Sequence, residues 1–209
     1  EIERLRAKIA SDLHDDVGSS LWSINLLSRM LGQHGTLQPD ERHDVAEINR
    51  IAVQTSNSIR DIIWLINPAF DSVQELVLRM KDSTATTLRG TVVQFNSEGV
   101  EMSAKLPQNT RQNILLLFKE ALTNIAKHSK ATEVRLSISE TPKEWVFDIC
   151  DNGVGFDSEA LNSGNGLKNM RRRAEDLKGS LTLTTRPGGG TRIVLSVAKT
   201  QRRSFFGLV

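Results

Sequence analysis

His14 and Asp15 are the first residues of this sequence whose types and spacing could carry chemistry, and they lie in the segment IASDLHDDVGSSL. An exposed imidazole beside a carboxylate is a competent nucleophile, because the carboxylate holds one ring nitrogen protonated and leaves the other lone pair free to attack. Leu13 belongs to an apolar helical stripe, so His14, one position on, is expected to point toward solvent. An ordinary surface histidine beside helix-solubilising acids explains the same triplet, and the triplet alone does not decide between these interpretations.

A second candidate is the glycine-rich segment DNGVGFD, which directly follows the strand-like run VFDIC. Gly153 and Gly155 allow the backbone to pass close to a ligand. Asp151, at the end of the run, can accept a hydrogen bond from an exocyclic amine. A tight turn explains this pattern as well as a binding loop does.

Two further glycine clusters could shape a binding site. Gly164 and Gly166 open a helix whose free N–H groups favour phosphate, although a loop with a helix cap gives the same sequence. Residues 188–190 are three glycines followed by Thr191, and a flexible hairpin turn is the simpler explanation of that run. Neither cluster matches the P-loop pattern, which requires Gly-Lys followed by Ser or Thr.

A polar stripe runs along the otherwise apolar helix expected at residues 109–128. Glu120, Asn124 and His128 are spaced four residues apart, so they share one face, and Lys127 lies next to it. The amide oxygen of Asn124 could bind Mg²⁺, which usually takes few protein ligands together with phosphates and water. A solvated helix face is the alternative. A zinc site is not expected, because the four histidines and one cysteine lack ligand spacing.

Two long helices are expected to position His14. Apolar residues recur every three or four positions through residues 2–31, and the same period resumes through residues 40–67 after a break that contains glycine and proline. Asp40 is expected to cap the second helix. A lone helical hairpin gives each apolar stripe one partner, which favours two copies pairing into a four-helix bundle. A plain coiled-coil stalk is the alternative.

The remaining elements are expected to form an α+β sandwich that positions the other candidates. A change of pattern at Pro68 divides the chain into domains 1–68 and 69–200, followed by a tail, 201–209. The expected helices are 71–88, 109–128 and 167–177, and the expected strands are 91–96, 133–139, 145–150, 180–185 and 191–197.

Composition excludes several classes of protein. The chain has 209 residues, 38% of them hydrophobic, and a formal net charge of +2, which excludes a disordered chain and gives no support to nucleic-acid binding. No run approaches about 18 apolar residues, so no membrane contact is expected in this segment. The single cysteine, Cys150, excludes an intramolecular disulfide and indicates a reducing compartment. Helical periodicity already runs at Glu1, so we expect a fragment whose upstream part is absent.

Taken in order, four segments resemble the ATP-binding domain of sensor histidine kinases, which belongs to the superfamily shared with Hsp90, type II topoisomerases and MutL. They are FKEALTNIAKHSKAT, DNGVGFD, GNGLKNMRRRAEDLKGSL and GGGTRIVLSV. The segment IASDLHDDVGSSL, with IIWLINP at the end of the second helix, resembles the dimerisation and phosphoacceptor domain of one subfamily. That subfamily typically signals to response regulators carrying a LuxR-type DNA-binding domain. The resemblance covers about residues 5–198.

The resemblance implies that the chain is the cytoplasmic core of a two-component histidine kinase. ATP and Mg²⁺ would bind in the second domain, the first domain would form a homodimer, and the receiver domain of a response regulator would accept the phosphoryl group. No direct nucleic-acid contact is implied, and the full-length protein would be membrane-anchored through an upstream sensor. The resemblance implies that His14 is phosphorylated and that Asp15 orients it. It implies that Asn124, supported by Glu120, binds Mg²⁺ and that Lys127 and His128 contact the phosphates. It also implies that Asp151 recognises adenine with Thr191 nearby, that Gly153 and Gly155 shape the pocket, and that Gly164 and Gly166 flank the phosphate lid.

One position departs from the subfamily pattern. Five residues after the phosphorylated histidine the subfamily often has Gln or His, thought to position water for dephosphorylating the regulator, and this sequence has Ser19. A serine hydroxyl is shorter, which puts phosphatase activity in question and leaves the kinase step unaffected. Two alternatives are a protein-serine kinase of the same superfamily and a non-catalytic dimeric scaffold that binds nucleotide.

Overall fold

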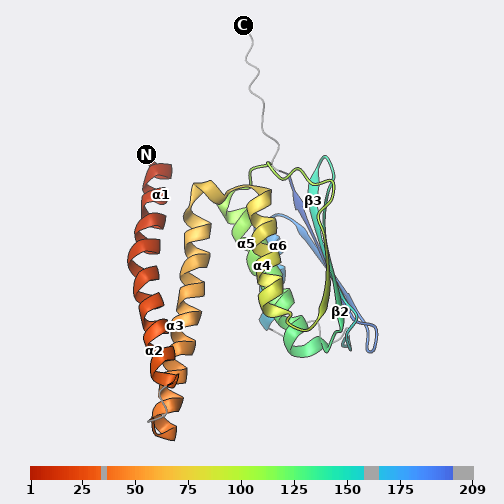
Figure 1. Ribbon diagram of the computed structural model, residues 1–209. Coiled ribbons are helices and arrows are strands. Elements are labelled where there is room, and N and C mark those ends of the chain that lie inside the picture. Colours follow the sequence, from red (N-terminus) through yellow and green to blue (C-terminus); the bar gives the residue numbers. More distant parts are fainter. Residues whose placement is uncertain (34–36, 158–164, 200–209) are drawn as a thin grey trace. The chain divides into compact units, whose positions relative to one another are not determined.

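The computed structural model describes residues 1–33, 37–157 and 165–199. The chain divides into two compact units, Glu1–Asp71 and Ser72–Val209. In its described part the first unit contains only helices, whereas the second combines helices with one β-sheet (Figure 1). Among the residues described, no helix has the length and apolar character needed to cross a membrane. The predicted tail, 201–209, lies outside the described residues.

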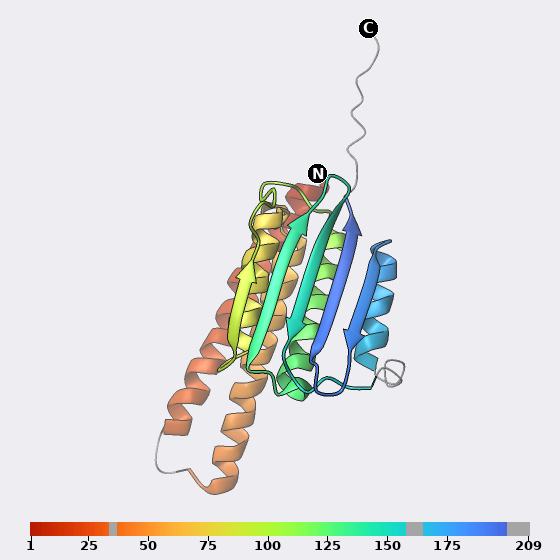
Figure 2. The ribbon, with the colours of Figure 1, turned by 90° about the vertical axis from the view of Figure 1, so that its right-hand side faces the viewer.

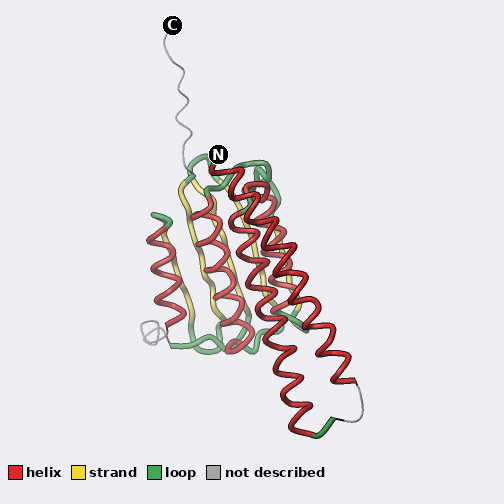
Figure 3. The backbone as a smooth tube through the Cα atoms, turned by 90° about the vertical axis from the view of Figure 1, so that its left-hand side faces the viewer, coloured by secondary structure: helices red, strands yellow, loops and turns green. Residues whose placement is uncertain are grey.

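The first unit is a helical hairpin, which confirms the predicted pairing of two long helices (Figure 3). Hydrogen bonds tie the two arms together: Arg6 Nε donates to the Ile66 carbonyl at 3.0 Å, and Asn49 Nδ2 donates to the Asn25 carbonyl at 3.2 Å. The elements of the unit are α1 (Ile2–Asp12), the π-helical turn η1 (Leu13–Gly18), α2 (Ser19–Gln33), α3 (Pro39–Ile66) and the short 3₁₀ helix η2 (Pro68–Phe70).

A single copy of the hairpin leaves much of its apolar surface exposed. Ala10, Ala52 and Trp64 are buried, but many other large apolar side chains of the hairpin are at least 41% exposed. Exposed apolar side chains that gather on one protein surface mark a place of association. The exposed residues are Ile2, Leu5, Ile9, Trp22, Ile24, Leu26, Leu27, Met30, Leu31, Ile48, Ile51, Val53 and Ile62.

Two details of the hairpin differ from the sequence prediction. The first arm is predicted as one α-helix, but Leu13–Gly18 form a π-helical turn within it. The spacing of three and four between apolar residues does not reveal such a turn. Its i→i+5 hydrogen bonds insert only one extra residue into the helix, so the apolar spacing is nearly unchanged. The prediction that Asp40 caps the second helix is wrong: α3 begins at Pro39, and the backbone N–H of Gln38 donates to Glu41 Oε2 at 2.8 Å. Proline suits the first helical position because its missing N–H would have no helical partner there.

The second unit is a five-stranded sheet in the order β1-β2-β3-β5-β4. Strand β1 is parallel to β2, and the other neighbours are antiparallel. Figure 2 shows the strands in front, with α4 and α5 behind them and α6 beside β4. The elements are α4 (Val73–Thr87), β1 (Val92–Asn96), α5 (Gln108–Asn124), the π-helical turn η3 (Ile125–Ser129), β2 (Glu133–Glu140), β3 (Glu144–Asp151), α6 (Asn165–Asp176), β4 (Ser180–Thr185) and β5 (Thr191–Ala198).

The core of the second unit lies between the sheet and the helices. Alternate residues of β2 and β3 are buried, because successive side chains of a strand point to opposite faces. Helix α5 contributes Leu117 and Phe118, which are at most 2% exposed, while Glu120 and Asn124 on the same helix are half-buried. The apolar face of α5 therefore fixes where its polar stripe must lie.

The predicted α+β sandwich is confirmed, and the ends of its helices and strands lie within about two residues of the predicted ones. The exception is the helix predicted at 109–128, whose last turn is the π-helical turn η3. The domain limits 1–68 and 69–200 stay a prediction.

Candidate functional site

His14 lies on an open helical surface of the first unit. Its side chain is 73% exposed, and that of Asp15 is 71% exposed. The Nδ1 atom of His14 is 3.1 Å from Oδ1 of Asp15, and Ser11 Oγ donates to the other carboxylate oxygen at 3.4 Å. Because an ionised carboxylate only accepts, this contact favours the tautomer with the proton on Nδ1 and leaves the Nε2 lone pair free.

The π-helical turn η1 carries both of these residues. Rare π turns occur often at functional sites. Ser19 Oγ donates to the Asp15 carbonyl at 2.5 Å, and Ser20 Oγ donates to the Asp16 carbonyl at 2.9 Å. The Ser19 hydroxyl is therefore bound to the backbone of its own helix.

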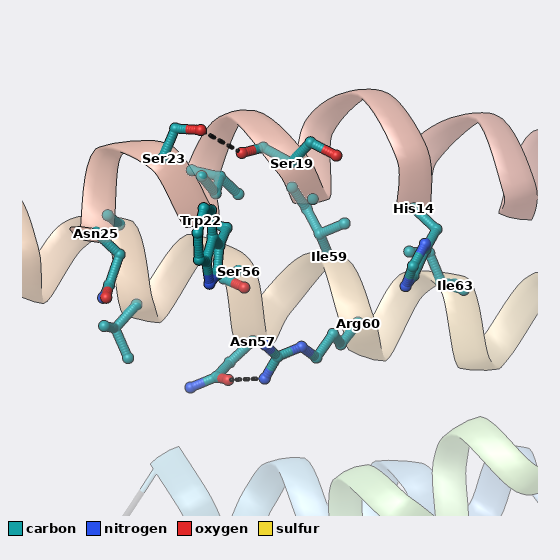
Figure 4. Close-up of a pocket in the computed structure, with 14 residues that line it drawn as sticks. His14, Ser19, Trp22, Ser23, Asn25, Ser56, Asn57, Ile59, Arg60 and Ile63 are labelled. Carbon is teal, nitrogen blue, oxygen red and sulfur yellow. Dashed lines mark hydrogen bonds between the residues drawn. The ribbon is translucent and has the colours of Figure 1, made fainter. Parts of the chain in front are cut away.

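A groove of about 640 Å³ lies between the two arms beside His14 (Figure 4). His14 and Trp22 line it from the first arm, and Arg60 and Ile63 line it from α3. Figure 4 shows the imidazole pointing toward α3 near Ile63, with Arg60 Nη1 donating to Asn57 Oδ1 at 3.4 Å. A nucleophile in this position is open to a second protein domain.

The second unit contains a cavity of about 740 Å³, a volume within the usual range of small-molecule sites. Its walls come from α5, η3, the start of α6 and the facing ends of β3 and β5. Apolar side chains such as Ile125, Phe156 and Ile193 form part of the lining. The predicted residues that line it are Glu120, Asn124, Lys127, His128, Asp151, Gly155, Gly166 and Thr191.

Asp151 is the buried acceptor of this cavity. It is 5% exposed, and its Oδ1 accepts a hydrogen bond from the Gly153 N–H at 2.8 Å. Burial raises the pKa of its carboxyl above the ordinary value, and hydrogen bonds from the backbone of Gly153 and Thr191 oppose that rise. An ionised carboxylate has about four lone-pair sites, so Asp151 retains capacity to accept from a ligand amine.

Close approach of other atoms explains three of the predicted glycines. A Cβ at Gly153 would strike the Ser129 carbonyl oxygen, so Gly153 supports Asp151 from a buried position and does not line the cavity. Gly155 has a positive φ of 57° and lies against backbone oxygens of the β4–β5 hairpin. Gly166 gives room to the Glu120 carboxylate. Gly164 lies outside the described residues.

The C-terminal end of α5 places four polar side chains around the cavity. Glu120 and Asn124 are half-buried, whereas Lys127 and His128 in η3 are exposed. In the part of the chain that the structure describes, no cluster of three or more His, Cys, Asp and Glu residues could hold a metal ion. The pair Asn124 and Glu120 still fits Mg²⁺, which prefers oxygen donors and commonly takes only one or two of them from protein when phosphates supply others.

Ser129 fixes the position of the glycine-rich loop, although it is not among the predicted site residues. Its carbonyl accepts from the Val154 N–H at 2.7 Å, and its Oγ donates to the Ile125 carbonyl at 2.9 Å. Ser129 is 8% exposed. A small polar residue at the end of an amphipathic helix was the only signal, and it does not distinguish this role from a cap.

One family match falls mainly in each of the two units. Residues 6–71 match the family described as histidine kinase, and residues 109–201 match the family described as histidine kinase-, DNA gyrase B- and HSP90-like ATPase. The chain belongs to the sensor histidine kinases. Membership of the ATPase family implies that the second domain of this histidine kinase core binds ATP.

Individual relatives agree with this assignment. The signal transduction histidine-protein kinase/phosphatase DegS of Brevibacillus brevis is 27% identical over 199 residues, which cover 93% of this chain and 51% of DegS. Sensor histidine kinase YvfT of Bacillus subtilis strain 168 is 30% identical over 200 residues, covering 92% of this chain and 50% of YvfT. The chain therefore spans about half the length of these relatives.

A solved structure shares the fold. The histidine kinase domain of the blue-light activated histidine kinase from Erythrobacter litoralis EL346 superposes with a TM-score of 0.56 at 17% sequence identity. The match covers 86% of this chain and 94% of that domain. The two chains therefore share the fold over most of their length.

Proposed function

We propose that this histidine kinase core transfers the γ-phosphoryl group of ATP to His14 and then to an aspartate on the receiver domain of a response regulator. The observation that carries the proposal is the exposed His14–Asp15 pair, with its two side-chain atoms 3.1 Å apart, in the same chain as an ATPase cavity. A scaffold that only bound nucleotide would have no use for an exposed nucleophile held by a carboxylate.

The chemistry of the first transfer follows from the His14 tautomer. The Nε2 lone pair attacks the γ-phosphorus, a nitrogen–phosphorus bond forms, and the bond from phosphorus to the bridging oxygen breaks with its electrons leaving on ADP. Asp15 holds the Nδ1 proton and stabilises the positive charge that the ring acquires. In the second transfer a carboxylate oxygen of the regulator attacks the same phosphorus and the imidazole leaves. Positioning and neutralisation of charge supply most of the rate in such transfers.

We assign the nucleotide contacts to the residues that line the cavity. Asp151 accepts from the adenine amino group, and Lys127 and His128 lie near the phosphates. Asn124, supported by Glu120, holds Mg²⁺. Bound Mg²⁺ supplies neutralisation of the phosphate charge. The support for these roles is the convergence of all five side chains on one cavity together with the ATPase family match.

We also propose that residues 1–68 form a homodimeric four-helix bundle and that residues 69–200 form the ATP-binding domain, with 201–209 as a tail. The support is the apolar surface that one hairpin leaves exposed, for example Leu27 at 59%. Light scattering on the intact chain should give twice the mass of one chain, and Leu27→Glu should shift the chain toward a monomer.

The groove beside His14 is the proposed docking place of the receiver domain, because the acceptor aspartate must reach this imidazole. We propose that the core lies in the cytoplasm, because ATP and response regulators act there. DegS is named a kinase/phosphatase, but the Ser19 hydroxyl of this chain donates to the Asp15 carbonyl. We therefore expect kinase activity to exceed phosphatase activity.

The proposal is tested by incubating the purified chain with γ-³²P-ATP and Mg²⁺ and then treating the labelled band with acid and base. An acid-labile, base-stable label supports it. The label should be absent from His14→Gln, which should still bind ATP within a few-fold of the wild-type affinity. It should persist in His43→Gln, a matched change at another exposed histidine.

Other outcomes identify the alternatives. Unchanged label in His14→Gln would contradict the assignment of the phosphoacceptor. An acid-stable label would indicate a protein-serine kinase. No label from a chain that still binds ATP would support the non-catalytic scaffold.

A further inference from the structure

Thr185, the last residue of β4, joins the glycine-rich loop to the β4–β5 hairpin without lining the cavity. Its Oγ1 accepts from the Phe156 N–H at 3.1 Å and donates to the Gly190 carbonyl at 3.0 Å. The same atom lies 3.3 Å from Oγ1 of Thr191. Three contacts therefore meet on one hydroxyl.

The hydrogen-bonding capacity of a hydroxyl decides the direction of the third contact. A hydroxyl has one proton and two lone pairs. The Gly190 carbonyl can only accept, so it takes the Thr185 proton, and the Phe156 N–H takes one lone pair. The remaining lone pair of Thr185 can only accept, so the proton between the two threonines comes from Thr191. Thr191, which lines the cavity, then turns lone pairs toward the ligand.

Asp151 lies beside Thr191 on the next strand, because the two residues are register partners on β3 and β5. Its carboxylate also only accepts. This wall of the cavity therefore presents acceptors from both side chains. A purine with an amino group at position 6 can donate to these acceptors. A purine with a carbonyl at position 6 would place its own acceptor against them and could form no hydrogen bond there.

The surrounding backbone keeps the Thr185 hydroxyl in place. The Gly188 N–H donates to the Val154 carbonyl at 2.6 Å, so the hairpin and the loop are also joined by main-chain atoms. Gly155 and Gly190 have positive φ angles of 57° and 70°, and a Cβ on either would strike the backbone of the facing segment. The two segments can only part by breaking all of these contacts together.

We propose that Thr185 is a positioning residue that makes this pocket select adenine over 6-oxopurines. Thr185 accepts the hydroxyl proton of Thr191, so that only the lone pairs of Thr191 face the base. The proposal rests on the proposed function, in which adenine binds at Asp151. Thr185 does not touch the nucleotide itself.

The test compares the affinities for ATP and ITP, which carry an amino group and a carbonyl at position 6. Binding to the whole chain in Mg²⁺ is measured by calorimetry for the wild type, Thr185→Val, Thr185→Ser and the control Thr184→Val, an exposed residue whose side chain points to the other face of the strand. We expect the wild type to prefer ATP by about tenfold or more. Thr185→Val should lower that preference about three- to tenfold, the usual worth of one hydrogen bond, because Thr191 regains a proton to donate. Thr185→Ser and Thr184→Val should keep it.

The ratio of the two affinities separates positioning from structural support. Equal losses for ATP and ITP in Thr185→Val, with the ratio unchanged, would overturn the inference. If Thr185→Val does not fold by circular dichroism, Thr191→Val replaces it and must lower the ratio in the same way; an unchanged ratio there overturns the inference as well. A wild-type chain that binds neither nucleotide would instead overturn the proposed function.

Discussion

The two candidate sites differ most in exposure. The His14 side chain is 73% exposed on a helix, whereas Asp151 is 5% exposed in a cavity. In the proposed function His14 meets two partners in turn, so nothing can enclose it permanently. In the same proposal Asp151 recognises one ligand, and its burial removes the water that would compete for its oxygens. Exposure therefore distinguishes the proposed transfer site from the proposed recognition site, although both depend on a carboxylate.

The same backbone feature serves both sites in different ways. Each lies at a π-helical turn: η1 contains no buried residue, whereas η3 is anchored by the buried Ile125 and Ser129. A turn that is anchored fixes side chains relative to a cavity, and a turn that is open leaves them accessible. Changes in the two regions should therefore act on different quantities.

The largest effect should come from Gly155→Ala in the glycine-rich loop, which is joined to the anchored turn η3 through Ser129. Gly155 has a positive φ, and a Cβ there would strike backbone oxygens of the hairpin. We expect the free energy of unfolding to fall by about 2–4 kcal/mol and phosphorylation to be lost, because the loop must move. Denaturant unfolding and the phosphorylation assay measure the two effects. Gly99→Ala is the control, since its φ is also positive but nothing lies within 4 Å of the added Cβ. Equal costs at both positions would show that the close approach is unimportant.

Asp15→Asn should act on rate alone in the open region. An amide holds the His14 ring less well and carries no charge to stabilise the imidazolium, so the phosphorylation rate should fall about 100-fold or more. ATP affinity should stay within twofold, because Asp15 lies outside the cavity. Single-turnover kinetics give the rate, and Asp16→Asn serves as the neighbouring control. A rate within twofold of wild type would remove Asp15 from the mechanism.

Asp151→Asn should lower ATP affinity by about tenfold while raising the stability of the nucleotide-free chain. The affinity falls because one acceptor is lost. The stability rises because the charge of a buried carboxylate, whose pKa burial raises, is no longer desolvated. Thermal unfolding with and without ATP shows both effects.

The pH dependence of that stability gain has a definite sign. Because burial raises the native pKa, the folded wild type holds a proton that the unfolded chain has released only at pH values between the unfolded and the folded pKa, and this carboxyl costs stability as pH rises through that window. The advantage of Asp151→Asn should therefore grow from acidic toward neutral pH. An advantage that shrinks over the same range would contradict the buried, charged carboxylate.

Gly18→Ala should have the smallest effect. Gly18 lies in the open turn, has nothing within 4 Å of an added Cβ, and has no positive φ. Replacing glycine in a helical segment should raise the free energy of unfolding by about 0.5–1 kcal/mol. Denaturant unfolding measures it. A loss of stability would show that the turn needs glycine.

Long segments with a regular spacing of apolar residues could be predicted from the sequence, whereas local hydrogen bonding could not. Helix α5 and strands β2 and β3 follow from alternation and spacing. The turns η1 and η3 differ from an α-helix by one residue, which leaves the apolar spacing nearly unchanged. Gln38 was missed as a cap because Asp40 has the stronger intrinsic preference, and tertiary and local contacts override such preferences.

The candidate cavity could be predicted only as separate segments. Asp151, Asn124 and Gly166 lie far apart in the sequence, and no periodicity shows that they converge on one cavity. The resemblance to a family supplied that convergence. Thr185 carries no signal in the sequence, because its contacts depend on the way two backbone segments pack against each other.

The π-helical turn at Leu13–Gly18 acts as a phase shift in the first arm. It adds one residue to an otherwise α-helical rod, and one residue corresponds to about 100° of rotation around a helix axis. Heptad positions counted from Ile2 therefore fall out of step with those of α2. A chimaera that fuses a foreign coiled coil to this chain must match its register to α1; a register matched to α2 would present the wrong face at the junction.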